Sequence, residues 1–275
     1  DVLVSDRPDL IIAINADTLA AAAGASELLN INFVYESYEY WPDHAHDSVC
    51  SLNGKQRAFL VESERNYADK ASRMITVSDY LAKEYSKDLR LFRMPEVIYN
   101  TPTNTAQSVT PVHIPMRVAF VGNIVPERNI EAIVDAVSCV VGSELFIQGG
   151  GYHKQKLMEY VEKKNCTEVV HFVDPVPYER LTASVNKYDV GVISYEVYNR
   201  HVDGALPNKF FEEMAGGLAM LLTRTHSFEE FENINDFARF IDPKDISTLT
   251  RQLEYLRDNP EVLTQMKVRA LEEAQ

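Results

Sequence analysis

The stretch from 204 to 223 restricts the fold most, because a loop, a helix and an apolar strand follow one another there without a break. Pro207 suits the first turn of a helix, where its missing N–H costs nothing. Residues 208–215 are good helix formers, and Gly216 or Gly217 is expected in the left-handed cap position. The apolar run LAMLLT follows at once. This order predicts an α/β fold with a parallel sheet.

The start of the same helix has the chemistry of an anion site. The first N–H groups of a helix and its dipole favour a negative ligand such as a phosphate. Lys209 places a positive charge where the dipole disfavours one, which suits a phosphate ligand better than it suits stability. Glu212 lies one turn beyond Asn208 and offers an acceptor for hydroxyl groups. An ordinary α/β connection with a surface lysine explains these residues equally well.

Strand-length apolar runs alternate with helical patterns along the rest of the chain, which predicts βαβ units. The first run, DLIIAIN, is continuously apolar, as in a parallel sheet covered on both faces. Asp17 is predicted to cap the helix that follows. The other predicted strands are 31–37, 73–78, 96–100, 116–122, 144–148, 169–173, 188–194, 218–223 and 237–242.

A segment rich in proline and threonine, TPTNTAQSVTPVHIP at 101–115, has no periodicity and is predicted to be a linker. We therefore expect a first domain at 1–113 and a second at 114–275. The second domain opens with MRVAFVG and the loop GNIVPERN, a generic layout for holding phosphate. The three glycines at 149–151 fit a ligand contact and a tight turn equally well.

Composition excludes several classes of protein. The net charge of −14 argues against binding to nucleic acid and against an anionic membrane. No apolar run reaches the roughly 18 residues that a membrane span needs. The three cysteines show no metal-binding spacing, so reduced, buried thiols in a cytoplasmic protein are expected. The start has no signal peptide and no methionine, which suggests a fragment or a processed product.

The block PNKFFEEMAGG resembles the nucleotide-sugar site of retaining GT-B glycosyltransferases of family four, whose bacterial members carry P-[NS]-K-[LF]-F-E-x-M-A-x-G. ADKASRMITVSDYLAKEY resembles the family's A-D-x-x-I-x-V-S-x-x-L-A, and EVIYN resembles its V-I-P-N block. The resemblance covers nearly the whole chain. It implies two Rossmann-like domains with parallel sheets that face a cleft, with the opening strands and helices of the first domain absent.

The resemblance also implies roles for individual residues. Arg128 and Lys209 would meet the donor diphosphate and act in catalysis, and Glu212 would accept the ribose hydroxyls. The backbone at Val173 and Asp174 would face the nucleotide base. The remaining donor-binding residues would be Gly122, Asn123, Leu206, Pro207 and Asn208.

The chain departs from the family pattern at two places. In the loop after 31–37, Tyr38 stands where relatives have a histidine near the acceptor, so Glu36 and Tyr38 are the acceptor-side candidates. His44 and His46 suggest a metal but have no further ligand at a supporting spacing, so a solvated loop is the simpler interpretation. Gly204 stands where relatives often have a glutamate, and Asp203 beside it is a possible substitute.

The expected function is transfer of a sugar from a nucleoside diphosphate sugar to a glycan, a lipid-linked glycan or a related acceptor. The resemblance implies retention of configuration, and no Asp-x-Asp pair suggests a metal. Peripheral membrane contact would need residues outside this chain. Two alternatives stay open: a non-catalytic GT-B-like subunit that binds a partner protein or glycan, and another GT-B enzyme such as a nucleotide-sugar epimerase.

Overall fold

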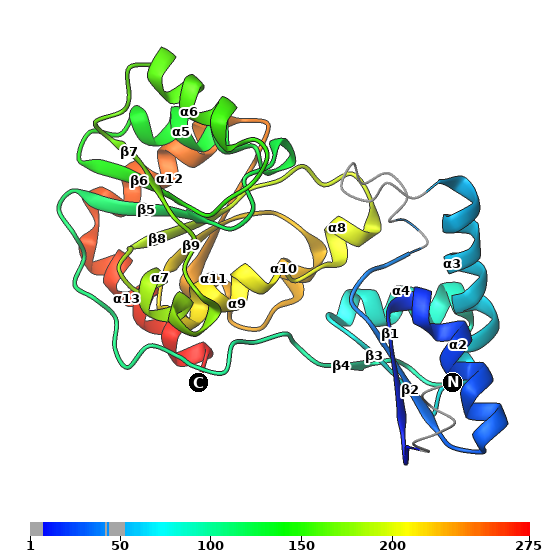
Figure 1. Cartoon of the computed structure of the whole chain (residues 1–275). Helices are drawn as coiled ribbons and strands as arrows, with labels where there is room; N and C mark the ends of the chain where they lie inside the picture. The colour runs from blue at the N-terminus through cyan, green and yellow to red at the C-terminus, as the bar shows by residue number, and fades with distance from the viewer. Residues whose placement is uncertain (1–7, 42, 44–52) are drawn as a thin grey trace. The chain divides into compact units, whose positions relative to one another are not determined.

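The computed structural model describes residues 8–41, 43 and 53–275, which fall into two compact units (Figure 1). The first unit comprises Asp1–Asn100, Val197–Leu206 and Thr225–Glu230. The second comprises Thr101–Glu196, Pro207–Arg224 and Phe231–Gln275. His44, His46 and Cys50 lie outside the described residues. The predicted linker belongs to the second unit.

The first unit holds a four-stranded parallel sheet in the order β1-β2-β3-β4. Its strands are β1 (Ile11–Ile14), β2 (Phe33–Ser37), β3 (Arg73–Thr76) and β4 (Glu96–Val97). The connecting helices are α2 (Asn15–Leu29), α3 (Gly54–Tyr67) and α4 (Asp79–Leu89), with the 3-10 turn η2 (Ala68–Lys70) after α3. The predicted βαβ arrangement is therefore confirmed.

Two predictions about the start of this unit are wrong. Residues alternate between buried and exposed along β1, with Ile12 at 58% and Ile14 at 46% exposure, so the strand is covered on one face only. It is also an edge strand among the described residues. Asp17 does not cap α2, because the helix already begins at Asn15 and Asp17 lies in its first turn.

Polar caps fix two helices of the first unit. The side chain of Asn53 accepts from the backbone N–H groups of Lys55 and Gln56, and the Gln56 side chain accepts from the Asn53 N–H, which completes a capping box. Ser78 accepts from the N–H of Leu81, as predicted, and its hydroxyl donates to the carbonyl of Gly204. These caps satisfy N–H groups that α3 and α4 leave without a partner.

Two short helices from later in the chain pack into the first unit, and the sequence pattern did not predict them. They are α8 (Arg200–Gly204) and α10 (His226–Glu230). The guanidinium of Arg200 donates to Asp43, Glu84 and Asp88 at 2.7–3.1 Å. These charge-assisted bonds attach α8 to α4.

The second unit holds a six-stranded parallel sheet in the order β10-β9-β8-β5-β6-β7. Helices α5, α6 and α12 lie on one face, and α7 and α9 on the other (Figure 1). The strands are β5 (Met116–Val121), β6 (Ser143–Gln148), β7 (Val170–Val173), β8 (Val190–Ile193), β9 (Ala219–Thr223) and β10 (Ala238–Ile241). The helices are η3 (Pro126–Arg128), α5 (Ile130–Ser138), α6 (Lys154–Lys163), η4 (Tyr178–Arg180), α7 (Leu181–Val185), α9 (Asn208–Ala215), α11 (Ile234–Phe237), α12 (Ile246–Asp258) and α13 (Pro260–Glu273).

Helix α9 and its ends match the sequence prediction. It spans the predicted residues, and its faces toward the core carry Phe211 and Met214, both buried. Gly217 has a φ of 70° and is the left-handed glycine that ends the helix. Strand β9, buried at every position, follows at once.

The prediction of buried thiols holds for one of the two described cysteines. Cys166 is buried, whereas Cys139 is exposed at the end of α5, and both are free. Cys139 is the C-cap residue of α5 and follows Val137, the last buried residue of that helix. No helix among the described residues is both long and apolar enough to cross a membrane.

Candidate functional site

Lys209 and Gly122 meet where β5 ends and α9 begins. Gly122 has a φ of 133°, and a Cβ built on it would lie 3.3 Å from Nζ of Lys209. The Lys209 ammonium also lies 4.6 Å from the ring centroid of Phe120. A glycine here therefore leaves room for the lysine and permits a backbone conformation that other residues rarely adopt. The carboxyl ends of parallel strands are where α/β sheets bind their ligands.

Arg128 brings a second cation to this end of the sheet. It ends η3, in the loop after β5, and its guanidinium carbon lies 5.6 Å from the ring centroid of Tyr195. Burial and the charge of Arg128 lower the pKa of Lys209, while Glu213 and Glu212 act in the opposite direction. Two neighbouring cations, one of them desolvated, favour an anionic ligand.

The first turn of α9 carries no side-chain cap. Pro207 occupies the N-cap position with an extended backbone and makes no capping hydrogen bond through its side chain. Asn208, the first helical residue, is exposed, whereas Phe210 is fully buried. Glu212 is half-buried, and burial raises its pKa although Lys209 acts against this. The helix thus presents its polar start to solvent while its aromatic residues fix it to the core.

The glycines at 149–151 position the Gly122 loop through close backbone packing. A Cβ on Gly149 would lie 1.9 Å from the carbonyl oxygen of Gly122, and one on Gly151 would lie 2.2 Å from that of Ile124. The N–H groups of Gly122 and Ile124 donate to the carbonyls of Gln148 and Gly150 at 3.0 and 2.8 Å. The described contacts of Gly149 and Gly151 therefore explain these residues without a ligand.

Three other predicted donor residues of the second unit follow or end strands β5 and β7 at the carboxyl edge of the sheet. Asn123 is exposed in the loop after β5. The carbonyl of Val173, at the end of β7, accepts from the N–H of Gly149 at 3.1 Å. The Asp174 carboxylate is exposed and pairs with Lys154 of α6 at 3.4 Å. These contacts tie the two residues to β6 and α6, and no described contact brings them to Lys209.

The remaining predicted residues belong to the first unit. Leu206 is the buried last residue of the segment that carries α8 and directly precedes Pro207. Glu36 and Tyr38 lie at the carboxyl end of β2, and the Tyr38 N–H donates to the side-chain oxygen of Asn15 at 3.1 Å. Burial and a hydrogen bond with Glu36 raise the pKa of the Tyr38 hydroxyl. The structure therefore brings these two acceptor-side candidates together.

Position 204 has no room for the glutamate that relatives often carry there. A Cβ on Gly204 would lie 2.5–2.8 Å from the side chains of Leu81 and Tyr80. The Gly204 carbonyl accepts hydrogen bonds from the hydroxyls of Ser78 and Ser227. Asp203 is held by His226, whose N–H and ring nitrogen lie 3.0 and 2.6 Å from its carboxylate oxygens. Gly204 and Asp203 are thus both engaged in contacts within the first unit.

Two further residues of the second unit were missed from the sequence. Tyr195 lies under Arg128, and Glu213 has its carboxyl buried on the inner face of α9. The spacing of Glu213 one turn after Lys209 was the available signal. Among the described residues, no cluster of three or more His, Cys, Asp or Glu side chains has the arrangement of a metal site.

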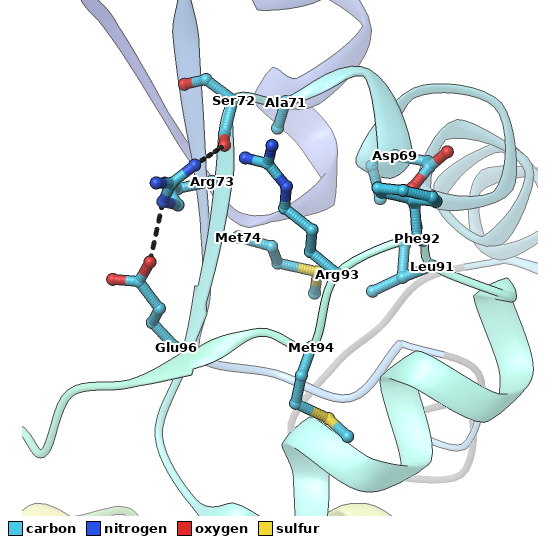
Figure 2. Close-up of a pocket in the computed structure, with 11 residues that line it drawn as sticks. Asp69, Ala71, Ser72, Arg73, Met74, Leu91, Phe92, Arg93, Met94 and Glu96 are labelled. Atoms are coloured by element: carbon cyan, nitrogen blue, oxygen red, sulfur yellow. Dashed lines mark hydrogen bonds and ion pairs between the residues drawn. The ribbon is translucent and has the colours of Figure 1, made fainter.

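A pocket on the first unit contains none of the predicted site residues (Figure 2). It is lined by residues around the start of β3 and by the loop 91–94, with the Arg73–Glu96 ion pair at one side. Its volume is about 640 Å³. It lies at the amino end of β3, opposite to the strand ends where ligands of α/β sheets bind. The candidate site is therefore defined by the chemistry at Lys209, and not by this hollow.

Solved structures share the fold over nearly the whole chain. HepE from Anabaena, solved in complex with UDP, matches with a TM-score of 0.75 at 14% identity, covering 99% of this chain and 75% of HepE. Sucrose-phosphate synthase from Thermosynechococcus elongatus matches with a TM-score of 0.76 at 14% identity, covering 100% of this chain and 70% of that one. TarM matches with a TM-score of 0.74 at 14% identity, covering 96% of this chain and 51% of TarM. At these identities the likeness establishes the α/β fold of GT-B glycosyltransferases.

Sequence comparison identifies the family. No curated protein matches the sequence. The family model described as glycosyl transferases group 1 matches residues 115–259, more than half of the chain. The match includes β5, the Gly122 loop, Arg128 and the whole of α9. The chain belongs to the group 1 glycosyltransferases.

Proposed function

We propose that this protein transfers a sugar from a nucleoside diphosphate sugar to a glycan, a lipid-linked glycan or a related acceptor. The observation that carries the proposal is the meeting of the Lys209 ammonium with the Gly122 loop at the start of α9, with Arg128 close enough to lower the lysine's pKa. Three elements here favour a diphosphate: two cations, a glycine backbone and a helix N-terminus. The UDP in the HepE structure supports a nucleotide donor.

Charge develops on the leaving diphosphate during such a transfer, and fixed cations lower the barrier. Arg128 and Lys209 supply this charge in our proposal. Gly122, Pro207 and Asn208 border the diphosphate, and Glu212 accepts the ribose hydroxyls. Asn123, Val173, Asp174 and Leu206 complete the donor site, and Glu36 with Tyr38 form part of the acceptor side. We further propose a retaining, metal-independent reaction in the cytoplasm.

Titration calorimetry tests this proposal directly. The intact chain is titrated with UDP, GDP, ADP and CMP, first with EDTA and then with Mg²⁺. Micromolar binding of one nucleoside diphosphate in EDTA supports the donor site and names the base. Transfer is then sought with sugars of that nucleotide, and the configuration of the product decides retention. A folded sample that binds none of these nucleotides contradicts the proposal.

The packing at Gly204 favours a second candidate, a non-catalytic subunit with the same fold. The glutamate that relatives often carry is excluded there by Leu81 and Tyr80, and Asp203 is held by His226. Nucleotide binding without sugar transfer or donor hydrolysis would favour this candidate. Turnover of a nucleotide sugar, lost in Lys209→Ala and kept in Lys163→Ala, would exclude it.

A further inference from the structure

The loop 38–40, which follows β2, is held from inside the first unit. Tyr38, one of the two acceptor-side candidates, is exposed, while Ser37 before it and Tyr40 after it are fully buried. The backbone carbonyl of Glu39 accepts from the hydroxyl of Tyr85 at 2.5 Å and from that of Ser37 at 3.1 Å. Polar contacts of buried residues therefore set the position of the exposed tyrosine.

These hydroxyls belong to a buried network that also contains Glu64 of α3. Oε1 of Glu64 accepts from the hydroxyls of Tyr35 and Tyr85 at 2.6 and 3.1 Å. Oγ of Ser37 lies 3.1 Å from the Tyr35 hydroxyl and 2.8 Å from that of Tyr85. All four side chains are fully buried, and Oε2 of Glu64 has no hydrogen-bond partner among the described residues. The network thus contains one group whose ionisation is costly in this environment.

The number of protons in this network limits which bonds exist together. Each hydroxyl has one proton to donate, and an ionised carboxyl only accepts. The proton of Tyr85 has two oxygens within reach, Oε1 of Glu64 and the carbonyl of Glu39. A carboxylate attracts this proton strongly, because hydrogen bonds to charged groups are the stronger ones. Within the network, the Glu39 carbonyl then keeps the hydroxyl of Ser37 as its donor.

A protonated Glu64 reverses this distribution. It is itself a donor, and it competes less for the Tyr85 proton. The distances then allow an unbroken chain of donors that ends on the Glu39 carbonyl. Its four links measure 2.6, 3.1, 2.8 and 2.5 Å, from Glu64 through Tyr35, Ser37 and Tyr85 to Glu39. Hydrogen bonds in such a chain strengthen one another, so protonation of Glu64 reinforces the hold on the loop.

Glu64 is the group of this network that changes its charge near neutral pH. Burial raises the pKa of Glu64 to about 7, and the hydrogen bonds from Tyr35 and Tyr85 act against this rise. Burial also raises the pKa values of both tyrosine hydroxyls well above their ordinary value, so both stay protonated. Asp17 of α2, the helix that packs against α3, acts on Tyr35.

Charged and titratable groups also face the loop from α4 and α8. Nε2 of His201 lies 3.0 Å from Oε2 of Glu39, and its Nδ1 accepts from the N–H of Tyr40 at 3.2 Å. The Tyr40 hydroxyl donates to Asp88 at 2.5 Å, and the guanidinium carbon of Arg200 lies 4.9 Å from the Tyr40 ring centroid. These contacts hold the ends of the loop, so a test must separate His201 from Glu64.

We propose that Glu64 and Tyr85 are positioning residues for the acceptor-side loop 38–40, with the Tyr85 proton divided between the Glu64 carboxyl and the Glu39 carbonyl. A protonated Glu64 leaves this proton to the loop, and an ionised Glu64 withdraws it. The loop that presents Tyr38 is then held more firmly below neutral pH than above it. The importance for a sugar acceptor rests on the proposed function, but the exchange of hydrogen bonds itself needs no ligand.

NMR of the nucleotide-free chain tests this exchange. The ¹³C carboxyl signal of Glu64 and the backbone ¹³C′ signal of Glu39, which reports hydrogen bonding of that carbonyl, are followed from pH 5 to pH 9. We expect both signals to move together, with a midpoint near 7. In Tyr85→Phe, Glu64 should still titrate while the Glu39 signal no longer follows it. A Glu39 signal that ignores Glu64 in the wild type, or still follows it in Tyr85→Phe, overturns the inference.

Glu64→Gln separates Glu64 from His201, which stays in place in this variant. The amide has no ionisation, so the change in the Glu39 signal near pH 7 should disappear. Glu62→Gln, at an exposed position of the same helix, is the matched control and should keep the change. A change retained in Glu64→Gln would assign the pH dependence to another group and contradict the proposal.

Kinetics test the importance of the loop for the acceptor. In the wild type, the KM for the acceptor should rise about fivefold between pH 6 and pH 8, the effect of one net hydrogen bond, while the donor KM stays constant. In Glu64→Gln the acceptor KM should not change over this range. A constant acceptor KM in the wild type would remove the link between the network and the acceptor. Absence of transfer by the wild type contradicts the proposed function, while the NMR titration still decides the roles of Glu64 and Tyr85.

Discussion

Nζ of Lys267 lies 2.8 Å from Oδ1 of Asp189, and neither side chain is exposed to solvent. The same aspartate accepts from the N–H of Arg117 at 2.9 Å and lies 3.0 Å from the ring of His113. Lys267 further donates to the hydroxyl of Thr110 at 3.1 Å. This network joins α13, the start of β8 and the segment at 101–115, and it lies at the amino end of β8.

Removing the charge of Lys267 should destabilise the second unit strongly. Lys267→Met leaves Asp189 buried without its main counter-ion, and the loss of one partner from a buried pair costs about 3–5 kcal/mol. Urea unfolding of the variant measures this loss. Lys163→Met, at an exposed position of α6, should change the free energy of unfolding by less than about 0.5 kcal/mol. Equal changes in the free energy of unfolding would show that the buried Lys267–Asp189 pair contributes no more to stability than an exposed lysine does.

Loss of Arg200 should release α8 from the first unit. Arg200→Met removes the charge-assisted bonds to Asp43, Glu84 and Asp88, so amide hydrogen exchange over 197–206 should increase. Lys83→Met is the matched control, because its ion pair with Glu230 is exposed and such pairs contribute about 0–1 kcal/mol. Unchanged exchange in Arg200→Met would mean that apolar packing alone holds α8.

Glu64 should make the first unit less stable as the pH rises. Burial raises its pKa to about 7, although the hydroxyls of Tyr35 and Tyr85 donate to it at 2.6 and 3.1 Å and act against the rise. The folded state therefore keeps a proton that the unfolded chain loses above a pH of about 4.5, so the free energy of unfolding falls until the pH passes about 7.

Glu64→Gln should remove this dependence, because the amide is neutral and its oxygen still accepts from both tyrosines. The variant should match the wild type near pH 4.5 and exceed it by about 3 kcal/mol at pH 8. Denaturant unfolding across this range measures the difference. Glu62→Gln, exposed on the same helix, serves as the control. A difference between variant and wild type that does not grow with pH would contradict the assignment.

Lys209 should contribute directly to nucleotide affinity. Lys209→Ala removes a charged donor from the Gly122 loop, so binding of the nucleoside diphosphate identified by calorimetry should weaken by about 1–3 kcal/mol. Lys163→Ala should bind as the wild type does. Wild-type affinity in Lys209→Ala would remove this residue from the donor site.

The Gly122 loop should depend on Gly149 and not on its neighbour. In Gly149→Ala the new methyl group would overlap the carbonyl oxygen of Gly122, and the φ of 149° is unfavourable for alanine. We expect lower stability and loss of nucleotide binding. Gly150→Ala provides the comparison, because a Cβ there meets no atom within 4 Å. Equal tolerance of both substitutions would show that the loop does not need this close packing.

Local sequence patterns predicted much of the fold and the centre of the site. The strands, the span of α9 and the Ser78 cap depend on nearby residues, and they were predictable for that reason. Predictions failed where the structure depends on contacts between residues that are far apart in the sequence. The exposed face of β1 depends on what packs there, and α8 depends on carboxylates far away in the sequence. Gly204 and Asp203 are likewise explained only by Leu81 and His226.

The sequence by itself determined the α/β class, the family motif and the placement of Lys209 and Glu212 on one short helix. Helical periodicity, glycine caps and apolar strands are local properties, so the residues specify them directly. Only the tertiary structure decided which groups share an environment. It placed Lys209 against Gly122, and it buried Lys267 with Asp189 and Glu64 with two tyrosines. It also seated the carboxyl of Glu213 over Gly191. Charge and pKa depend on burial and on neighbours from other strands, which no local pattern encodes.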